Sequence, residues 1–303
     1  FARETFSTPD YRAGPLIVLD GVIISNDSPE LIQIGGTTQN RLLDINPNDI
    51  ARIEVVKGAA AAALYGSRAN NGVMQIFTKT GKAGETRVTY STRVETQAIR
   101  NTLNVNMAQN DQGQFLDNDG NPLPDGQRRW DYQDFIFDRA YGTEQYLSVS
   151  GSSEDTRFFT SGGYFGTQGV VDGSGFRRYN GTARLEHTLS DWVNVTAGAR
   201  YAFSQSDDIP NGGLNTLYGA MTGFIFGPNT TDPQRTELGD FPDIGTFSNP
   251  IEVQSRFDFG QETSRFIGDL QVNMTPLDGL SIDYVIGLDT YVIAENGGVV
   301  LAD

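Results

Sequence analysis

The stretch "WVNVTAGARYAFS", residues 192–204, alternates between two kinds of side chain. One set is apolar and comprises Val193, Val195, Ala197, Ala199, Tyr201 and Phe203. The other set is largely polar and comprises Asn194, Thr196, Gly198, Arg200, Ala202 and Ser204. Alternation with period two is typical of a β-strand whose two faces meet different surroundings.

The same alternation recurs in "RYNGTARLEHT", residues 178–188, and in "LSIDYVIGLD", residues 280–289. Seven strands are predicted, with ends defined to about two to four residues. They lie near residues 86–97, 144–151, 157–167, 177–189, 191–205, 261–275 and 279–292. Several exceed the five or six residues, roughly, that are usual in soluble proteins.

The connections between these strands alternate between long and short. The long ones are 98–143, "QGVVDGSGF" and 206–260, and the short ones are "SSED", "LSD" and "TPLDG". A transmembrane barrel has short periplasmic turns at one rim and long extracellular loops at the other, whereas a soluble sandwich has no reason for this sorting. The pattern therefore favours an all-β transmembrane barrel, with the apolar faces toward lipid, over a β-sandwich.

Composition excludes several classes of protein. The 303 residues include 22 basic and 38 acidic side chains, a net charge of −16, which disfavours binding to nucleic acid. No run approaches the 20 or so apolar residues that a membrane-spanning helix needs. There is no cysteine, and the one histidine, His187, is expected at a rim without a functional role.

Residues 1–82 lack the amphipathic alternation and predict a small α/β unit. "PLIVLDGVIIS" indicates a strand, a turn and a second strand, "DINPNDIARIEVV" a capped helical turn before a strand, and "VMQIFTKT" a further strand. The short link "GKAGE" should hold this unit close to the barrel strands. We therefore divide the chain into residues 1–82 and 83–303.

The chain resembles the SusC/RagA-like TonB-dependent outer-membrane receptors. The resemblance rests on "PLIVLDGVIIS", on "LLDINPNDIARIEVVKGAAAAALYGSRANNGVMQIFTKTGK" and on the run from Trp130 to Tyr201. The matching plug motif comprises Lys57, Gly58, Tyr65, Gly66, Arg68, Asn71 and Gly72. Gly58 departs from the pattern, because SusC-like chains usually carry an acidic residue there.

The resemblance implies that residues 1–82 are the C-terminal part of a plug and residues 83–303 the first strands of a bacterial outer-membrane barrel. It implies active import of a large nutrient, a glycan or a peptide, with the TonB energy-coupling complex and a SusD-like surface lipoprotein as partners. Contact with outer-membrane lipid is also implied, whereas a cofactor and enzymatic activity are not. The alternative is a non-transporting barrel that serves as a surface-binding or assembly scaffold.

Such transporters have about 22 strands, so the seven predicted here cannot close a wall. The chain is accordingly expected to be a fragment, without the remaining strands and the TonB-contacting segment.

The alanines 59–63 predict a small-faced helix that can approach plug strands or the barrel wall closely. Gly66 and Gly72 should supply turn conformations that other residues disfavour. A phosphate-binding loop is disfavoured because Ser67 and Arg68 stand where that motif requires Lys and Ser or Thr. Arg68 could pair with carboxylates of the wall, or could simply be solvated.

Three further groups are candidate ligand sites. Asp117, Asp119 and Asn121 have the spacing of a calcium loop, but Pro122 replaces the glycine of that loop and no Glu closes it, so a hydrated turn is favoured over a calcium site. Asp207 and Asp208 should lie on an extracellular loop, where they could bind ligand or only aid solubility. Trp130 could stack on ligand rings, but a place in an aromatic girdle or in loop packing is favoured.

Overall fold

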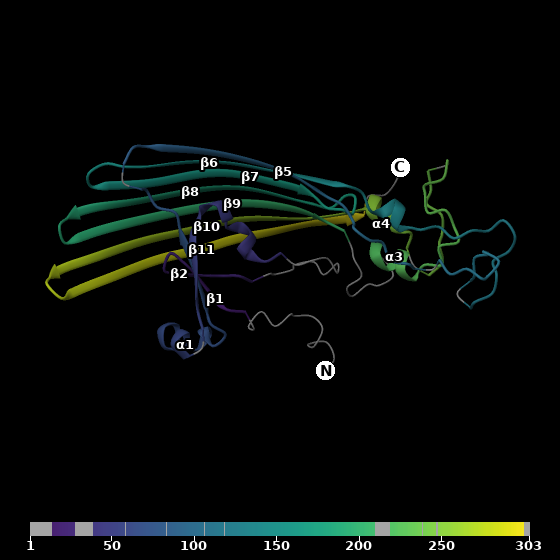
Figure 1. Cartoon of the computed structure of the whole chain (residues 1–303), viewed down its shortest axis with the longest axis horizontal. Helices are drawn as coiled ribbons and strands as arrows, with labels where there is room; N and C mark the ends of the chain where they lie inside the picture. The colour runs from purple at the N-terminus through teal and green to yellow at the C-terminus, as the bar shows by residue number, and fades with distance from the viewer. Residues whose placement is uncertain are drawn as a thin grey trace.

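The computed structural model of the chain describes residues 14–27, 39–57, 59–82, 84–105, 107–117, 119–209, 219–237, 239–246 and 248–299. Within these residues the backbone forms a seven-stranded sheet and a four-stranded sheet. Figure 1 shows that the unit containing the four-stranded sheet, called the small unit below, packs against one face of the seven-stranded sheet. No helix in the described ranges is long and apolar enough to cross a membrane.

The larger sheet, called the wall below, is antiparallel throughout and follows the order of the sequence. Its strands are β5 (Arg87–Gln97), β6 (Ala140–Ser152), β7 (Thr156–Gln168), β8 (Gly175–Ser190), β9 (Val193–Asp208), β10 (Phe257–Leu277) and β11 (Leu280–Val299). The seven predicted strands are thereby confirmed. β11 continues past the predicted end at 292 because its ladder to β10 runs on to the pair Phe257↔Val299, where the sequence no longer alternates.

The connections lie as the alternation of lengths predicts. Residues 153–155, 191–192 and 278–279 make tight turns at one end of the wall, and residues 98–139 and 209–256 make long excursions at the other. The connection 169–174 lies at the same end of the wall as the two long connections, but it is short.

The small unit contains β1 (Leu16–Leu19), β2 (Val22–Ile24), β3 (Ile50–Val56) and β4 (Val73–Thr78) in the order β2-β1-β4-β3, with β1 and β4 parallel. An Asp-Gly turn joins β1 to β2, with Asp20 at φ 46° and Gly21 at φ 87°. Two 3₁₀ turns follow, η2 (Arg41–Asp44) and η3 (Pro47–Asp49). The Asn46 side chain caps η3 by accepting a hydrogen bond from the Asn48 N–H, which confirms the capped helical turn predicted before β3.

The alanine run forms the short helix α1 (Ala59–Tyr65), followed by η4 (Ser67–Ala69). Ala61 is fully buried against Val18 and Val73, so the helix packs closely on the strands of its own unit. Gly66 at φ 75° and Gly72 at φ 93° adopt the predicted turn conformations. At Gly72 a Cβ atom would also lie 3.0 Å from the Val56 carbonyl oxygen.

The wall has an inner face toward the small unit and an outer face away from it. On β9, Arg200 and Ser204 are buried on the inner face, whereas Tyr201 is 51% exposed on the outer face. This is the facing that the alternation of residues 192–204 predicted.

The two longest connections pack together beyond the strand ends. They carry α2 (Gln133–Ile136), α3 (Ala220–Phe226) and α4 (Pro250–Arg256), and Tyr132, Ile136 and Phe224 share one buried cluster. The buried Arg129 side chain donates to the carbonyl oxygens of Leu116 and Pro228 and to Asn229 Oδ1. The described parts of the connections 98–139 and 209–256 therefore pack into one folded unit.

Candidate functional site

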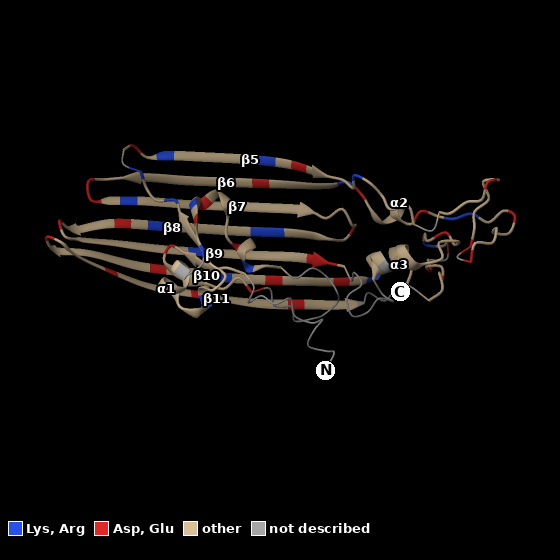
Figure 2. Ribbon diagram, turned by 60° about the horizontal axis from the view of Figure 1, so that its bottom comes forward, with Lys and Arg blue, Asp and Glu red and all other residues tan. Residues whose placement is uncertain are grey.

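The small unit meets the wall through three aspartates at its turns. Asp20 lies in the β1–β2 turn, Asp44 ends η2 and Asp49 ends η3. All three are buried, with exposures of 6%, 6% and 2%. Because a buried carboxylate is costly unless it is paired, their partners on the wall define the contact. Figure 2 shows that charged residues lie along the wall strands as well as in the turns.

Asp20 faces two arginines of the wall. Its Oδ2 accepts from Arg184 Nη1 at 2.9 Å and from Arg200 Nη2. Thr78, at the end of β4, donates its backbone N–H to Asp20 Oδ1 at 2.9 Å and its hydroxyl to Oδ2 at 2.6 Å. Both oxygens are therefore engaged, and they connect the small sheet to β8 and β9.

Asp269 on β10 balances the second positive charge of this cluster. Its Oδ1 accepts from Arg200 Nη1 at 2.7 Å, and Oδ2 lies 3.5 Å from Arg184 Nη1. Two aspartates and two arginines thus form a neutral group, which lowers the cost of removing four charges from water.

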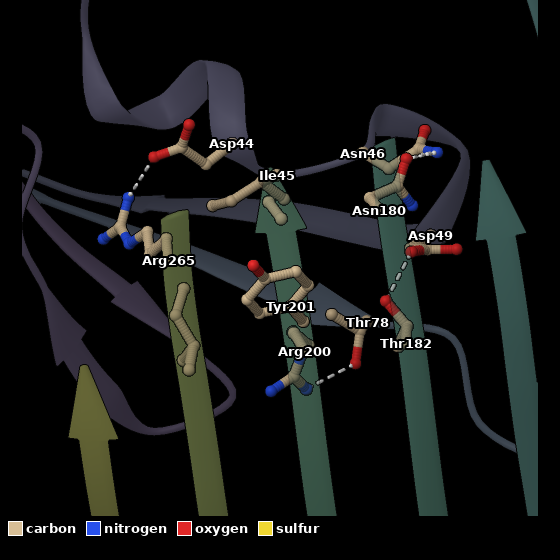
Figure 3. A pocket seen from close by; sticks show the side chains of 12 residues that line it. Asp44, Ile45, Asn46, Asp49, Thr78, Asn180, Thr182, Arg200, Tyr201 and Arg265 are labelled. Carbon is tan, nitrogen blue, oxygen red and sulfur yellow. Dashed lines mark hydrogen bonds and ion pairs between the residues drawn. The ribbon is translucent and has the colours of Figure 1, made fainter. Parts of the chain in front are cut away.

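Asp44 faces a second ionic group on β10 and β11. Its Oδ2 lies 3.4 Å from Arg265 Nη1, as Figure 3 shows. Arg265 also binds both carboxylate oxygens of Asp289, each at 2.8 Å, and donates to the carbonyl oxygens of Arg41 and Ser25. Such a bidentate arginine pair fixes orientation as well as charge. Arg265 therefore joins two turns of the small unit to the wall.

Asp49 is held by hydroxyl groups instead of arginines. Tyr146 OH donates to its Oδ1 at 2.8 Å, Ser161 Oγ to the same oxygen at 2.6 Å, and Thr182 Oγ1 to Oδ2 at 2.7 Å. The three donors lie on β6, β7 and β8. One carboxylate of the small unit thus contacts three adjacent wall strands.

Amide and backbone groups complete the polar contact. Asn46 Nδ2 donates to Asn180 Oδ1 at 2.9 Å, and Arg178 Nη1 donates to the Leu43 carbonyl oxygen at 2.6 Å. A cavity of about 20 Å³, lined by Asn46, Asn180 and Arg200 among others, lies between the small unit and the wall. The small volume shows that the two surfaces fit closely.

Apolar and close backbone contacts border the polar ones. Ile267 of the wall joins a buried cluster with residues of β1, β2 and β4. A Cβ atom at Gly287 would lie 2.2 Å from Val22, and one at Gly81 would lie 2.5 Å from the Phe158 backbone nitrogen. The link after β4 is therefore seated directly on β7.

Burial raises the pKa of Asp44, and the nearby Arg41 and Arg265 only partly oppose this shift. Burial likewise lowers the pKa of Arg41, with Asp44 acting in the opposite direction. Both directions follow from the penalty for charge in a low-dielectric site.

Comparisons with known proteins bear on this architecture. The family model "TonB-dependent Receptor Plug Domain" matches residues 4–73. "TonB-dependent receptor SusC" of Bacteroides thetaiotaomicron is 36% identical over 193 residues, which cover 62% of this chain and 18% of SusC. "TonB-dependent receptor P26" of Formosa agariphila is 27% identical over 273 residues, which cover 86% of this chain and 26% of P26. These relatives are described as receptors.

The chain belongs to the SusC/RagA-like TonB-dependent receptors. The fold agrees with the solved structure of the RagAB peptide importer in its closed-closed state, with a TM-score of 0.72 at 22% identity over 94% of this chain and 35% of that one. The small unit is accordingly the plug, the seven strands are part of a barrel, and the receptor is an outer-membrane protein. The chain spans about a quarter or less of the curated relatives named above.

The plug motif that carries the resemblance lies away from the wall, on and around α1 (Figure 1). Tyr65 accepts a hydrogen bond from Gln75, and Gly66 and Gly72 make turns within the plug. Lys57, Arg68 and Asn71 are exposed, and no ion pair joins Arg68 to another residue that the structure describes. Gly58 lies outside the described residues.

The other candidate ligand residues are not brought together. Asp207 and Asp208 were expected on a loop, but they are the last residues of β9, because its pairing with β10 continues to Phe259↔Asp208. Asp207 is on the outer face, while Asp208 accepts from Ser206 on the inner face. Trp130 is half-buried under Arg128 and against Phe135, within the packing of the long connections.

The calcium candidates form a closed turn. Asp117 Oδ1 accepts from the backbone N–H groups of Asp119 and Asn121, and Asp117 Oδ2 accepts from the Asn121 amide. These hydrogen bonds, above all the one from the Asn121 backbone N–H, lower the pKa of Asp117. Across the described ranges, no cluster of three or more His, Asp or Glu side chains could hold a metal ion.

The wall residues that make the contact were not predicted from the sequence, although the sequence carries a signal for them. Arg178, Arg184, Arg200 and Arg265 all stand on the polar face of predicted transmembrane strands. A charged side chain at membrane depth is expensive unless it is paired. Inward arginines therefore call for acidic partners, and "LDG" and "DINPND" in the plug supply them.

Proposed function

We propose that this receptor imports a large nutrient, a glycan or a peptide, across the outer membrane, and that the plug closes the barrel lumen until TonB acts on it. The observation that carries the proposal is the polar contact between plug and wall, in which Asp20, Asp44 and Asp49 meet arginines and hydroxyl groups of β6–β10. Residues 1–82 as plug and 83–303 as wall are part of the same proposal.

A polar contact suits a barrier that must open and close again. An apolar seal would lose roughly 25 cal/mol for each Å² that becomes wet. Hydrogen bonds and ion pairs instead exchange their partners for water, so that their net contribution is only about 0.5–1.5 kcal/mol each. A pull on the plug can therefore replace wall partners by water one group at a time.

The proposal includes three kinds of partner. The TonB energy-coupling complex would supply the work, a SusD-like surface lipoprotein would deliver the nutrient, and outer-membrane lipid would surround the wall. The packed unit formed by the described parts of residues 98–139 and 209–256 supports the second partner, because it presents a surface at the rim opposite the tight turns. A peptide is one candidate nutrient because the similar RagAB structure is titled a peptide importer.

Uptake of a labelled nutrient mixture by cells that carry the intact receptor tests the transport step. Deletion of the energy-coupling complex should abolish internalisation and leave surface binding intact. Continued internalisation without that complex would refute the proposal, and surface binding without internalisation in normal cells would favour a scaffold.

A reversible cross-link tests the role of the plug. Asn46→Cys with Asn180→Cys places one thiol on the plug and one on the wall, where the two amides now form a hydrogen bond. The 303 residues contain no native cysteine that could compete. A reducible bifunctional thiol reagent should block uptake, and dithiothreitol should restore it. Thr188→Cys with Asn194→Cys links two wall strands at a similar contact and should leave uptake unchanged. Undiminished uptake through a tethered plug would refute the gating step.

A further inference from the structure

The outer face of the wall carries a continuous apolar band. The strand register aligns Thr160 with Ala183, Ala183 with Ala199, and Ala199 with Gly268. On β9 the outward residues stay apolar from Val193 to Phe203. Eleven residues at about 3.3 Å each, tilted by some 45°, span about 25 Å, the height of the lipid-facing band in outer-membrane barrels.

Aromatic side chains mark the limit of this band toward the long connections. Tyr164, Tyr179 and Phe203 are paired across β7, β8 and β9, and the Tyr164 and Tyr179 rings lie 4.9 Å apart. One row lower, Tyr201 pairs with Phe266. Aromatic belts of this kind lie at the boundary between hydrocarbon and headgroups. The outward residues beyond Phe203 therefore face the headgroup layer on the side of the long connections.

The next two outward rows, called the outer belt below, change in character. The first row contains Thr143, Gly166, Arg177, Gln205 and Glu262 in register, with Val94 and Ala294 at its two ends. The second row contains Gln168, Gly175, Asp207, Gly260 and Asn296 in register, with Tyr141 donating its backbone N–H to the Gln168 side chain. Polar side chains and glycines thus predominate on β6 to β10, so that the wall surface there is both hydrophilic and indented.

Two hollows occupy the outer belt. The larger, of about 840 Å³, extends from Tyr141 and Tyr164 to Arg177. The smaller, of about 410 Å³, lies between Gln205, Glu262 and Asn296. Asp207 lines both, and Gly175 and Gly260 lie where a side chain would otherwise fill the space. The hollows are neighbours on one surface.

These hollows are separate from the path that the plug closes. The residues that alternate with the outer belt, Arg178 and Ser204, point to the opposite face, where Arg178 binds the Leu43 carbonyl oxygen of the plug. A nutrient in the lumen would meet that inner face, whereas a molecule in the outer belt would approach from the surrounding membrane.

The charge of the outer belt restricts the chemistry of its occupant. Its hollows are lined by five carboxylates, Asp138, Asp172, Asp207, Asp258 and Glu262, and by two arginines, Arg139 and Arg177. Arg177 is already paired with Asp207 at 3.4 Å. The excess of negative charge opposes a phosphate headgroup. Carboxylate, amide and tyrosine groups are instead suited to donating to and accepting from many hydroxyls.

We propose that the outer belt binds the uncharged sugar headgroup of a glycolipid in the outer leaflet. The sugar lies in the hollows beside Tyr141 and Tyr164, its hydroxyls meet Asp207, Gln205 and Asn296, and its acyl chains descend over the apolar band. This site deepens the lipid contact of the proposed function and does not require transport to occur.

The intact receptor in nanodiscs tests this site. The discs contain equal amounts of a monoglucosyl diacylglycerol and a phosphatidylglycerol of the same chain length, and native mass spectrometry counts the retained lipids. The wild type should retain the glucolipid about tenfold over the phospholipid. Gly175→Leu, which fills the larger hollow, and Asp207→Ala should each bring the ratio close to one. Free glucose, added to discs of phospholipid alone, should not bind.

Matched variants and other occupants complete the test. Gly181→Leu makes the same change on β8 inside the apolar band, where a Cβ has room, and should keep the wild-type ratio. Unchanged enrichment in both belt variants, stronger retention of phosphatidylglycerol, or equal binding of free glucose would overturn the proposal. So would loss of receptor dimers in Gly175→Leu without loss of glucolipid, because the belt would then be a contact between receptors.

Discussion

Replacing Asp20 by asparagine should loosen the plug from the wall without disturbing the turn that carries it. Asparagine is the suitable substitution because Asp20 has a positive φ of 46°, which asparagine tolerates better than alanine does. The amide can still accept from the Thr78 N–H, but it leaves Arg184 and Arg200 facing Asp269 alone. Two buried cations then share one anion.

Removal of one partner from a buried ion pair costs roughly 3–5 kcal/mol. We expect the lower end, about 3 kcal/mol, because the contact to Thr78 is kept. Amide hydrogen exchange of β1 and β4 in the nanodisc-embedded receptor should then accelerate about 10²-fold. Exchange in β8 and β9 at a distance from Arg184 and Arg200 should change little.

Two comparisons make this expectation refutable. Glu54→Gln removes a carboxylate that pairs with Arg52 at 2.7 Å on the exposed side of the plug, and such surface pairs contribute about 0–1 kcal/mol. The double variant Asp20→Asn with Arg184→Gln restores the balance of one cation and one anion and should recover part of the loss. If Asp20→Asn accelerates exchange no more than Glu54→Gln does, the ionic group does not hold the plug.

Three further predictions concern the membrane face, the pH response and the long connections. Ala199→Arg, on the lipid-facing side, should destabilise the barrel by about 2–4 kcal/mol near the midplane, whereas Thr196→Arg on the inner face should be tolerated better; equal losses in folding titrations would contradict the assigned facing. The raised pKa of Asp44 means that the folded receptor binds this proton more tightly than the unfolded chain, so its contribution favours folding at low pH and weakens as the pH rises above about 3.8 through the raised pKa. Thermal melting should show this trend relative to Asp44→Asn, and identical pH profiles would refute it. Arg129→Ala removes hydrogen bonds to Leu116, Pro228 and Asn229 and should cost the unit of long connections about 3 kcal/mol; limited proteolysis should cut residues 98–139 faster, and an unchanged cleavage rate would show that the apolar clusters alone hold the unit.

The strands and their facing could be predicted from the sequence because each face of the wall has one chemical environment. The alternation of Val195, Ala197 and Ala199 with Thr196 and Arg200 separates an apolar outer face from an inner face that meets the plug. The ends of β10 and β11 could not be predicted, because beyond the membrane both faces are wet and pairing alone extends the ladder to Val299. The same cause placed Asp207 and Asp208 on a strand instead of a loop.

The contact between plug and wall could not be assigned from the sequence, because its partners are far apart in the chain. Asp20 and Arg200 are separated by 180 residues, and Asp44 and Arg265 by 221. The plug motif, which is conspicuous in the sequence, instead determines the local fold around α1. Arg68 of that motif was a natural candidate for an ion pair with carboxylates of the wall. The observed ion pairs have the opposite polarity, because the plug supplies aspartates and the wall supplies arginines.

The parallel pairing of β1 with β4 has a mechanical consequence. A force applied through the chain before β1 pulls on Leu16, while β4 leads at its far end through Thr78 to the link seated on β7. Parallel neighbours pulled from opposite ends are loaded in shear, so their hydrogen bonds share the tension instead of breaking in succession. The side-chain contacts with the wall should therefore yield first, and the plug should shift as a folded body before it unravels.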